Sequence, residues 1–145
     1  MDEKRKSLKV MQRMERLATN VYKQQVCAFK GNEISDKLQK AYENEKEHAE
    51  TLKEIIFRQN SAPSLLGIFF GFAGAVAGII TLCLGKILLL KIDIFIECKA
   101  VEDYTKFISQ IDYDAETLSL LNRIIDDEKR HVSTWNASIK TLKKK

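Results

Sequence analysis

Proline, glycine and cysteine are all scarce in this sequence. Its 145 residues include 1 proline, 6 glycines and 3 cysteines, and aromatic residues make up 8%. So little proline and glycine excludes a collagenous chain and disfavours a many-stranded sandwich with its many turns. The cysteines, Cys27, Cys83 and Cys98, form no C-x-x-C pair. A disulfide framework, a zinc ribbon and a rubredoxin-type iron site therefore lose their sequence basis, and a reducing compartment is the simplest expectation.

Neither sign of charge dominates the chain. Lys and Arg total 24 against 20 Asp and Glu, which gives a net charge of +4. No basic stripe or nucleic-acid motif accompanies this small excess, so we expect no nucleic-acid partner. The mixed charge of residues 1–6 leaves no apolar signal segment, and we expect a protein that is not secreted. With 45% hydrophobic and 30% charged residues, the chain fits one helical domain over 1–145.

One long apolar run interrupts the charge-rich flanks. Residues 65–84 carry no charge and exceed the roughly 18 apolar residues of a transmembrane candidate. The run lacks the G-x-x-x-x-G-K-[ST] pattern, so its glycines do not form a phosphate-binding loop. Their spacing instead permits close contact between helices.

On either side of this run, inward-facing residues recur every three or four positions, as on amphipathic helices. Pro63 ends the second helix, and Asp112 or Asp114 caps the fourth. The pattern predicts an all-α chain of two antiparallel helical hairpins joined by a long apolar crossover at 61–85. The four helices are expected at about 4–30, 33–59, 85–110 and 113–141.

The inward-facing residues of each expected helix include an acid near the middle of the helix, where an unpaired charge is costly to bury. The only two histidines each follow a glutamate by three residues, in Glu45-x-x-His48 and Glu128-x-x-His131. This i, i+3 spacing places both side chains of a pair on one helix face. Two such pairs on separate helices indicate a metal site.

The two halves of the chain repeat this pattern. An offset of 82 residues relates Glu15 to Glu97 and Tyr22 to Tyr104. An offset of 83 residues relates Glu45 to Glu128 and His48 to His131. Asp93 competes with Glu97 on the third helix, but only Glu97 keeps the offset. Four carboxylates and two imidazoles are the ligands of ferritin-like di-iron and di-manganese bundles. We therefore expect a ferritin-like four-helix bundle that binds two Fe ions, with Mn as an alternative. The expected ligands are Glu15, Glu45, His48, Glu97, Glu128 and His131.

Several segments carry a family resemblance: Glu15-x-x-Ala18-x-x-Val21-Tyr22-x-x-Gln25, Glu45-x-x-His48, Gly71-Phe72-Ala73, Leu84-Gly85-Lys86, Glu97 and Glu128-x-x-His131. Together they resemble the demethoxyubiquinone hydroxylases, membrane-bound di-iron enzymes of quinone biosynthesis in the ferritin-like superfamily. The resemblance implies ligand roles for the same six residues, and hydrogen bonds to those ligands from Tyr22 and Tyr104. Rubrerythrins are a second resemblance, without their rubredoxin module.

Two positions depart from the resembled family. Cys98 and Val132 stand where that family usually has a second acid and a second histidine. The metal site is therefore better supported than the quinone substrate. We expect Cys98 to be a buried, inert thiol.

The expected function is that of a membrane-associated di-iron oxidoreductase, a monooxygenase that activates O2. Its candidate substrate is a demethoxyquinone-like lipid. An external donor would supply the electrons, because no flavin or nicotinamide fingerprint is present. The alternative is a rubrerythrin- or ferritin-like ferroxidase, peroxidase or iron-handling protein. A second alternative is a non-enzymatic bitopic membrane protein, in which the acids are surface charges.

The ligand set also bears on the topology of residues 65–84. A single span would place the first two helices and the last two on opposite sides of the membrane, so the six ligands could not meet. We therefore expect this run to lie in the membrane interface, to re-enter, or to pack within a homodimer. The resemblance favours a membrane-binding surface. The expected location is peripheral or monotopic, on the cytoplasmic face of the cell membrane.

Overall fold

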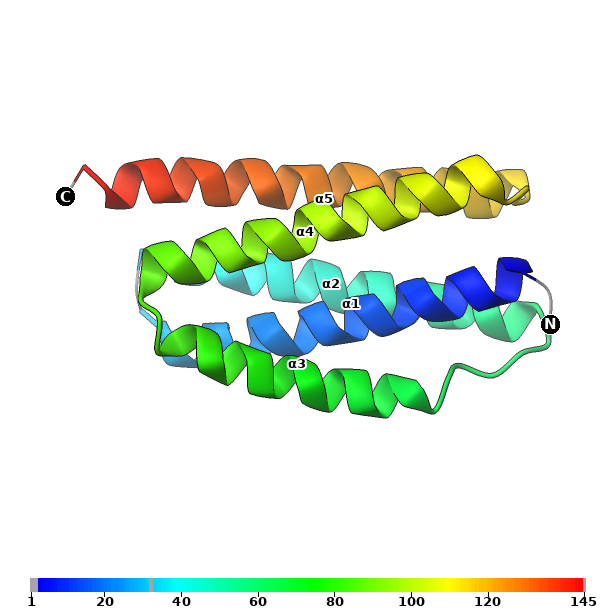
Figure 1. Cartoon of the computed structure of the whole chain (residues 1–145), viewed down its shortest axis with the longest axis horizontal. Coiled ribbons are helices and arrows are strands. Elements are labelled where there is room, and N and C mark those ends of the chain that lie inside the picture. Colours follow the sequence, from blue (N-terminus) through cyan, green and yellow to red (C-terminus); the bar gives the residue numbers. More distant parts are fainter. Residues whose placement is uncertain (1–2, 32, 145) are drawn as a thin grey trace.

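The computed structural model describes residues 3–31 and 33–144. Within these residues the chain forms five α-helices and no strand, which confirms the all-α prediction (Figure 1). The helices are α1 Glu3–Ala28, α2 Ser35–Arg58, α3 Leu66–Leu82, α4 Lys86–Gln110 and α5 Ala115–Leu142. The crossover between the predicted hairpins thus contains a helix of its own, α3.

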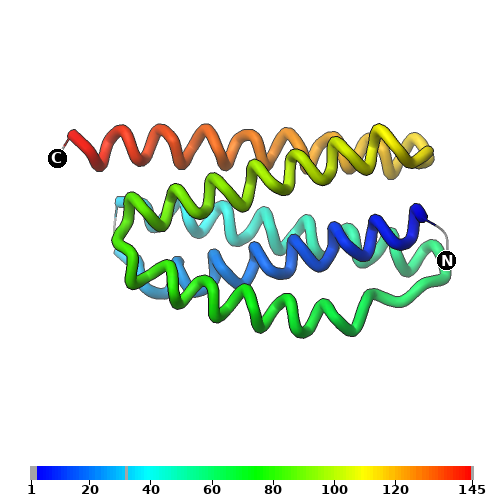
Figure 2. Tube along the Cα trace, in the orientation of Figure 1, coloured from blue at the N-terminus to red at the C-terminus, as the bar shows by residue number. Residues whose placement is uncertain are grey.

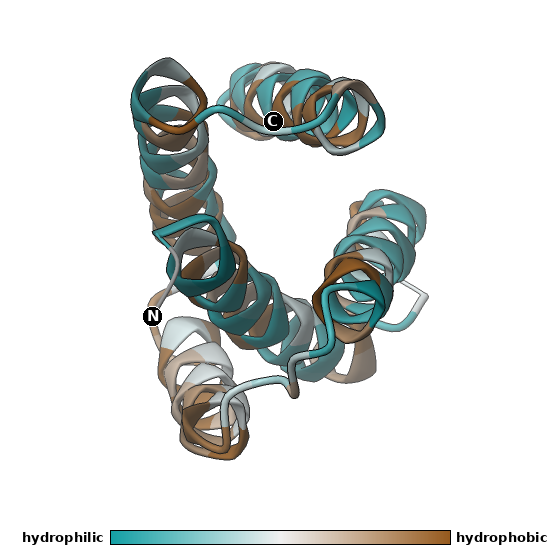
Figure 3. Ribbon diagram, turned by 90° about the vertical axis from the view of Figure 1, so that its right-hand side faces the viewer, coloured by the Kyte–Doolittle hydropathy of each residue, from teal (hydrophilic) through white to brown (hydrophobic). Residues whose placement is uncertain are grey.

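The four long helices pair into two antiparallel hairpins. α1 packs against α2 and α4 packs against α5, and the chain reverses direction within each pair (Figure 2). The two hairpins meet less extensively, through α2 with α5 and α1 with α4. The perpendicular view shows α3 on the outside, beside α1 and away from α5 (Figure 3).

Two apolar clusters lie between the hairpins, and each takes residues from both. One contains Leu8, Leu52, Tyr104 and Leu121, and the other contains Tyr22, Leu38, Leu90 and Trp135. Full burial of one large apolar side chain contributes roughly 1.5–3 kcal/mol. On each long helix one buried glutamate falls between the residues of the two clusters, so the clusters enclose a polar layer at mid-height that contains Glu15, Glu45, Glu97 and Glu128.

The helix ends follow from local chemistry. The side chain of Asp114 accepts a hydrogen bond from the backbone N–H of Thr117 at 2.9 Å, so Asp114 and not Asp112 caps α5. Gly85 has a φ of 77° between α3 and α4. A residue with a side chain would be strained in that conformation, so glycine allows this tight connection.

α3 lies unusually close to α1 because glycines face it. A Cβ built on Gly74 would lie 2.3 Å from the backbone oxygen of Leu17, and one on Gly78 would lie 2.8 Å from that of Val21. Real side chains do not reach such distances, so only glycine permits this approach. The glycines therefore mediate contact within the chain, with α1 as the partner.

The opposite face of α3 is apolar and exposed. Its large exposed side chains are Leu66, Ile68, Phe69, Phe72, Val76, Ile79 and Ile80. Figure 3 shows hydrophobic and intermediate residues along this helix. Among the residues described, no helix combines the length and the apolar character needed to cross a membrane.

One expectation about an individual side chain was wrong. Cys98 is exposed, as are Cys27 and Cys83, because it lies on a face of α4 that the other helices do not cover.

Candidate metal centre

Six side chains from the four long helices converge in the polar layer. α1 supplies Glu15, α4 supplies Glu97, and α2 and α5 each supply one glutamate and one histidine three residues later, namely Glu45 and His48, and Glu128 and His131. All four glutamates are at most 2% exposed. The alternative that treats these acids as surface charges is therefore wrong.

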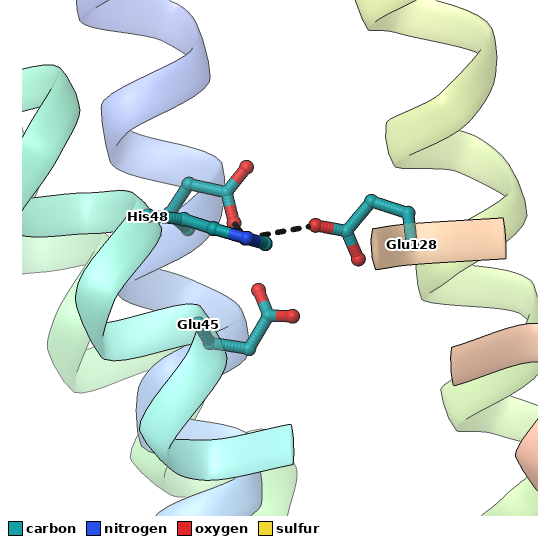
Figure 4. Close-up of side chains that lie close together, drawn as sticks. Glu45, His48 and Glu128 are labelled. Atoms are coloured by element: carbon teal, nitrogen blue, oxygen red, sulfur yellow. Dashed lines mark ion pairs between the residues drawn. The ribbon is translucent and has the colours of Figure 1, made fainter. Parts of the chain in front are cut away.

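The six residues form two overlapping sets. One set contains Glu15, Glu45, His48 and Glu128, and the other contains Glu45, Glu97, Glu128 and His131. Within each set, one ligand atom per residue lies within 4.8 Å of the others. Glu45 and Glu128 belong to both sets. Figure 4 shows Glu45 and His48 from α2 and Glu128 from α5 pointing toward one another.

The Nδ1 atoms of both histidines face the carboxylates. His48 Nδ1 lies 3.1 Å from Glu128 Oε1 and 3.7 Å from Glu15 Oε2. His131 Nδ1 lies 3.1 Å from Glu45 Oε1 and 3.4 Å from Glu97 Oε1. The same ring nitrogen is thus directed inward from each side of the site.

Three atoms of these residues are buried without a hydrogen-bond partner: Glu45 Oε1, His48 Nδ1 and Glu128 Oε1. His48 Nδ1 and Glu128 Oε1 are close in space but are not in hydrogen-bond geometry. Unsatisfied buried polar atoms are costly and rare in folded proteins. The two carboxylate oxygens offer lone pairs, as does His48 Nδ1 once it is deprotonated. Carboxylate with imidazole suits Fe(II) or Mn(II), so the residues fit a pair of divalent cations.

Burial and mutual repulsion dominate the acids of the metal-free cluster. Desolvation raises the pKa of Glu45 well above its ordinary value, and the charges of Glu128 and Glu97 raise it further. Desolvation followed by the charge of Glu128 likewise raises the pKa of Glu97. Without bound cations, the carboxyl groups of Glu45 and Glu97 therefore tend to stay protonated.

The same carboxylates raise the pKa values of the two histidines. Burial alone would lower the pKa of His48, but the nearby carboxylates of Glu128 and Glu15 outweigh it and raise the pKa to about 10. Burial likewise opposes the rise at His131, where Glu128 and Glu97 bring the pKa to about 10. For Glu128, burial opposes ionisation, but the adjacent imidazoles of His131 and His48 lower its pKa. Protonated imidazoles thus balance part of the acid charge when no metal is bound.

Two tyrosines donate hydrogen bonds to the two glutamates that belong to only one set each. Tyr104 on α4 donates a hydrogen bond to Glu15, and Tyr22 on α1 donates one to Glu97. Trp135 Nε1 in turn donates to the hydroxyl of Tyr22 at 2.9 Å. Burial first, and the neighbouring glutamates second, raise the pKa of both tyrosines well above 10. Both hydroxyls therefore stay protonated as donors, so the hydrogen bonds expected from the two tyrosines are present.

Comparison with known families covers nearly the whole chain. Residues 2–144 match the family described as ubiquinone biosynthesis protein COQ7. The chain belongs to the COQ7 family. This confirms the resemblance to the demethoxyubiquinone hydroxylases, on which the ligand roles partly rest. Those ligand roles themselves remain predictions.

One curated relative is also similar to the chain. It is the "NADPH-dependent 3-demethoxyubiquinone 3-hydroxylase, mitochondrial" of Caenorhabditis elegans, 24% identical over 122 residues. The match covers 81% of this chain and 65% of the relative, so the chain spans just under two thirds of the relative's length.

The sequence pattern did not reveal one residue beside the cluster, Asp127. Its Oδ2 lies 3.0 Å from His48 Nε2, the ring nitrogen that points away from the cluster. Asn44 donates to the same oxygen at 3.4 Å, and Arg130 forms an ion pair with Oδ1. Asp127 directly precedes Glu128, but its contact with another helix depends on how α2 and α5 are rotated. The 83-residue offset to Asn44 was the available signal.

Asp93, the competitor of Glu97, lies in a separate polar group. Its Oδ1 accepts a hydrogen bond from Gln25 Nε2 at 2.9 Å, and the same nitrogen lies 3.2 Å from Thr81 Oγ1. Burial raises the pKa of Asp93 to about 7 despite the hydrogen bond from Gln25. The structure brings Glu97 into the cluster of six and places Asp93 outside it. The repeat offset therefore pointed to the acid that lies in the cluster, and the ligand role of Glu97 stays a prediction.

Two openings between α2 and α5 reach the edge of the site. One, of about 380 Å³, is lined by His131, Trp135 and Asp127 together with Lys37, Lys40 and Arg130. A smaller one, of about 100 Å³, is lined by His48, Asp127 and Arg123. His131 is the most exposed of the six residues, with 12% of its side chain accessible. Solvent therefore reaches the edge of the cluster from this side.

Proposed function

We propose that the protein is a di-iron oxidoreductase that activates O2 and hydroxylates a demethoxyquinone-like lipid. The observation that carries this proposal is the pair of four-residue sets sharing Glu45 and Glu128 inside a buried polar layer. Membership of the COQ7 family and the name of the nematode relative support the choice of substrate. α1, α2, α4 and α5 would form a ferritin-like four-helix bundle, with α3 as an external helix.

The two sets would hold two ions, Fe in preference to Mn, with Glu45 and Glu128 shared between them. When bound, the metal pair would supply the reducing equivalents and the open coordination positions that O2 chemistry requires. Four carboxylates carry four negative charges, which match two divalent cations. Metal binding would displace the protons that burial and repulsion keep on Glu45 and Glu97.

The chain's own residues would fix this site in three ways. Tyr22 and Tyr104 hold Glu97 and Glu15 by hydrogen bonds, which sets the orientation of both carboxylates. The apolar clusters above and below exclude water, and this strengthens electrostatic interactions between the ligands. The openings beside His48 and His131 leave one side accessible.

An external donor would supply the electrons. The name of the nematode relative says that it is NADPH-dependent. For this chain we propose a soluble or membrane-bound reductant that delivers electrons from outside the buried site, because the sequence lacks a nicotinamide or flavin fingerprint. Product formation with NADPH alone, compared with product formation with a chemical reductant, identifies which of them supplies the electrons.

We also propose that the exposed face of α3 binds a lipid surface. Phe69 is 69% exposed and Phe72 is 72% exposed, and contiguous apolar surface of this kind marks membrane or protein contacts. Lys86 and Lys91 follow α3 and could approach anionic headgroups. The protein would then be peripheral or monotopic, on the cytoplasmic face of a membrane. A homodimer through this face is the competing arrangement.

The direct test is a reaction of anaerobically reconstituted protein with Fe(II), a demethoxyquinone analogue, a reductant and O2. We expect a hydroxylated product that contains one oxygen atom from ¹⁸O₂ and that is lost in Glu128→Ala. Iron oxidation or peroxide reduction without an organic product would instead favour the ferroxidase or peroxidase alternative. No reaction in protein that holds two irons would overturn both.

A further inference from the structure

The two halves of the site differ at one position beside the predicted ligands. Asp127 precedes Glu128, and Asn44 precedes Glu45 at the same 83-residue offset that relates the two histidines. One half of the repeat therefore has a carboxylate where the other has a neutral amide.

The carboxylate of Asp127 contacts only one histidine. Its Oδ2 lies 3.0 Å from His48 Nε2, and the two side chains are only 15% and 6% exposed. In the described part of the chain, His131 Nε2 has no hydrogen-bond partner. Asn44, the counterpart of Asp127, donates to Asp127 and not to His131.

This contact would fix the ring of His48 for metal binding. A carboxylate that accepts a hydrogen bond from Nε2–H selects the tautomer with its lone pair on Nδ1. It also makes Nδ1 a stronger electron-pair donor to a metal ion. Nδ1 is the buried, unpartnered atom that faces Glu15 and Glu128. Arg130 engages the other oxygen of Asp127, which keeps Oδ2 directed at the imidazole.

A second difference between the halves acts in the same direction. Trp135 donates to the hydroxyl of Tyr22, which itself donates to Glu97. The counterpart of Trp135 at the 83-residue offset is Leu52, which cannot donate to Tyr104. Hydrogen bonds in such a chain strengthen one another. These hydrogen bonds draw electron density from the Glu97 carboxylate. It should therefore bind a metal ion more weakly than the Glu15 carboxylate, which accepts a hydrogen bond from Tyr104 alone.

We propose that Asp127 is a positioning residue that makes the two metal positions unequal. The position that includes His48 and Glu15 binds its ion more tightly and fills first, and the position that includes His131 and Glu97 fills second. This inference rests on the proposed metal site, and it adds an order of occupancy that the ligand set alone does not define.

Stepwise binding of Co(II) tests this order. Full-length protein is titrated anaerobically, and heat and the visible absorption of Co(II) are recorded. We expect two steps whose dissociation constants differ by tenfold or more. Asp127→Asn is expected to weaken the first step by about tenfold or more and leave the second within about threefold, because such partners of metal-bound histidines are typically worth 10- to 100-fold in affinity.

Asp126→Asn is the matched control. Asp126 is the neighbouring acid on α5, its side chain is 75% exposed, and it pairs with Lys129. The variant removes the same charge from the adjacent position in the sequence but breaks no contact with His48. We expect both Co(II) steps to stay within about twofold of wild type, since exposed ion pairs contribute little.

A spectroscopic readout separates positioning from a general structural effect. The chain has only two histidines, so ¹⁵N-histidine spectra of the Zn(II)-loaded protein contain two rings. We expect Asp127→Asn to shift the Nε2–H signal of one ring, and Asp126→Asn to shift neither. Two equal Co(II) steps that Asp127→Asn leaves unchanged, or an unshifted Nε2–H signal, would overturn this inference alone. Absence of any Co(II) uptake would overturn it together with the proposed metal site.

Discussion

Tyr22 on α1 and Glu97 on α4 are hydrogen-bonded across the interior, although 75 residues separate them in the sequence. Tyr104 and Glu15 form the reciprocal bond between the same two helices. The pair of contacts joins the first half of the chain to the second at the level of the site. It links the stability of the protein to the orientation of two predicted metal ligands.

The two tyrosines should differ when each hydroxyl is removed. Tyr22→Phe leaves both Glu97 and Trp135 Nε1 without that partner, whereas Tyr104→Phe affects only Glu15. A buried polar group that loses its partner costs about 1–3 kcal/mol. Urea unfolding of the metal-free variants should therefore show Tyr22→Phe to be less stable than Tyr104→Phe by about that amount.

Tyr42→Phe is the control for these substitutions. Tyr42 is half-buried, and its hydroxyl forms no hydrogen bond with a described residue. We expect its unfolding free energy to stay within about 0.5 kcal/mol of wild type. Equal losses in Tyr22→Phe and Tyr104→Phe would contradict the assigned hydrogen bond from Trp135.

The metal-free protein should become less stable as the pH rises from 6.5 toward 10. The pKa values of His48 and His131 are raised from 6.5 to about 10, so their stabilisation is complete below pH 6.5 and is lost as they deprotonate in the folded state. The raised pKa values of Glu45 and Glu97 act in the same direction from about pH 4.5 upward. The lowered pKa of Glu128 acts oppositely, and only as the pH falls below about 4.5.

Metal should reverse this trend. Cations compete with protons for the ligands, so the stabilisation by Co(II) should grow over the same pH range. Melting temperatures with chelator and with Co(II), measured between pH 6.5 and 10, check both slopes. The double variant His48→Gln/His131→Gln should flatten the slope in chelator. A pH-independent melting temperature of the metal-free wild type would be incompatible with the charge balance described above.

Gly74→Ala should detach α3 from α1 or strain its packing. The added Cβ would meet the backbone of Leu17, at 2.3 Å from the oxygen and 3.0 Å from two carbons, and backbone cannot move aside cheaply. We expect a loss of roughly 1–3 kcal/mol in unfolding free energy.

Gly67→Ala is the matched control on the same helix. Its Cβ would meet the end of the Arg16 side chain at 3.2 Å, and this flexible group can shift. Alanine also favours the helix by up to about 1 kcal/mol over glycine. Gly67→Ala should therefore be neutral or stabilising. A similar loss in both variants would show that close approach of the two helices is not the cause.

Phe69→Asp/Phe72→Asp should abolish binding to vesicles of phosphatidylcholine and phosphatidylglycerol, measured by co-sedimentation. Both side chains are exposed, so the melting temperature should stay near that of wild type. Ser133→Asp/Asn136→Asp adds the same charge to exposed positions of α5 and should still bind. Unchanged sedimentation of the Phe69→Asp/Phe72→Asp variant, together with its conversion from dimer to monomer, would favour the homodimer.

The sequence carried enough information to predict the long helices and the composition of the site. Helical periodicity and the i, i+3 spacing of glutamate and histidine depend on one helix at a time, and the repeat offset related the two halves. The offset also separated Glu97 from Asp93, which the structure places with Gln25. These features need no knowledge of how the helices pack.

Features that depend on packing were beyond the sequence pattern. The contact between Asp127 and His48 requires a particular rotation of α5 against α2. The exposure of Cys98 likewise depends on which face of α4 the other helices cover. The apolar run was expected to face a membrane or a second copy, but its glycines pack against α1 of the same chain and leave only the opposite face available.

The number of metal ions that the cluster holds decides whether the proposed function stands. Protein purified without oxygen and supplied with Fe(II) should contain two irons per chain by elemental analysis. Glu128 belongs to both sets, so Glu128→Ala should lose both irons, whereas Glu97→Ala should retain about one because Glu97 belongs to a single set. Well-folded wild-type protein without stoichiometric metal would contradict the metal site and every function proposed from it.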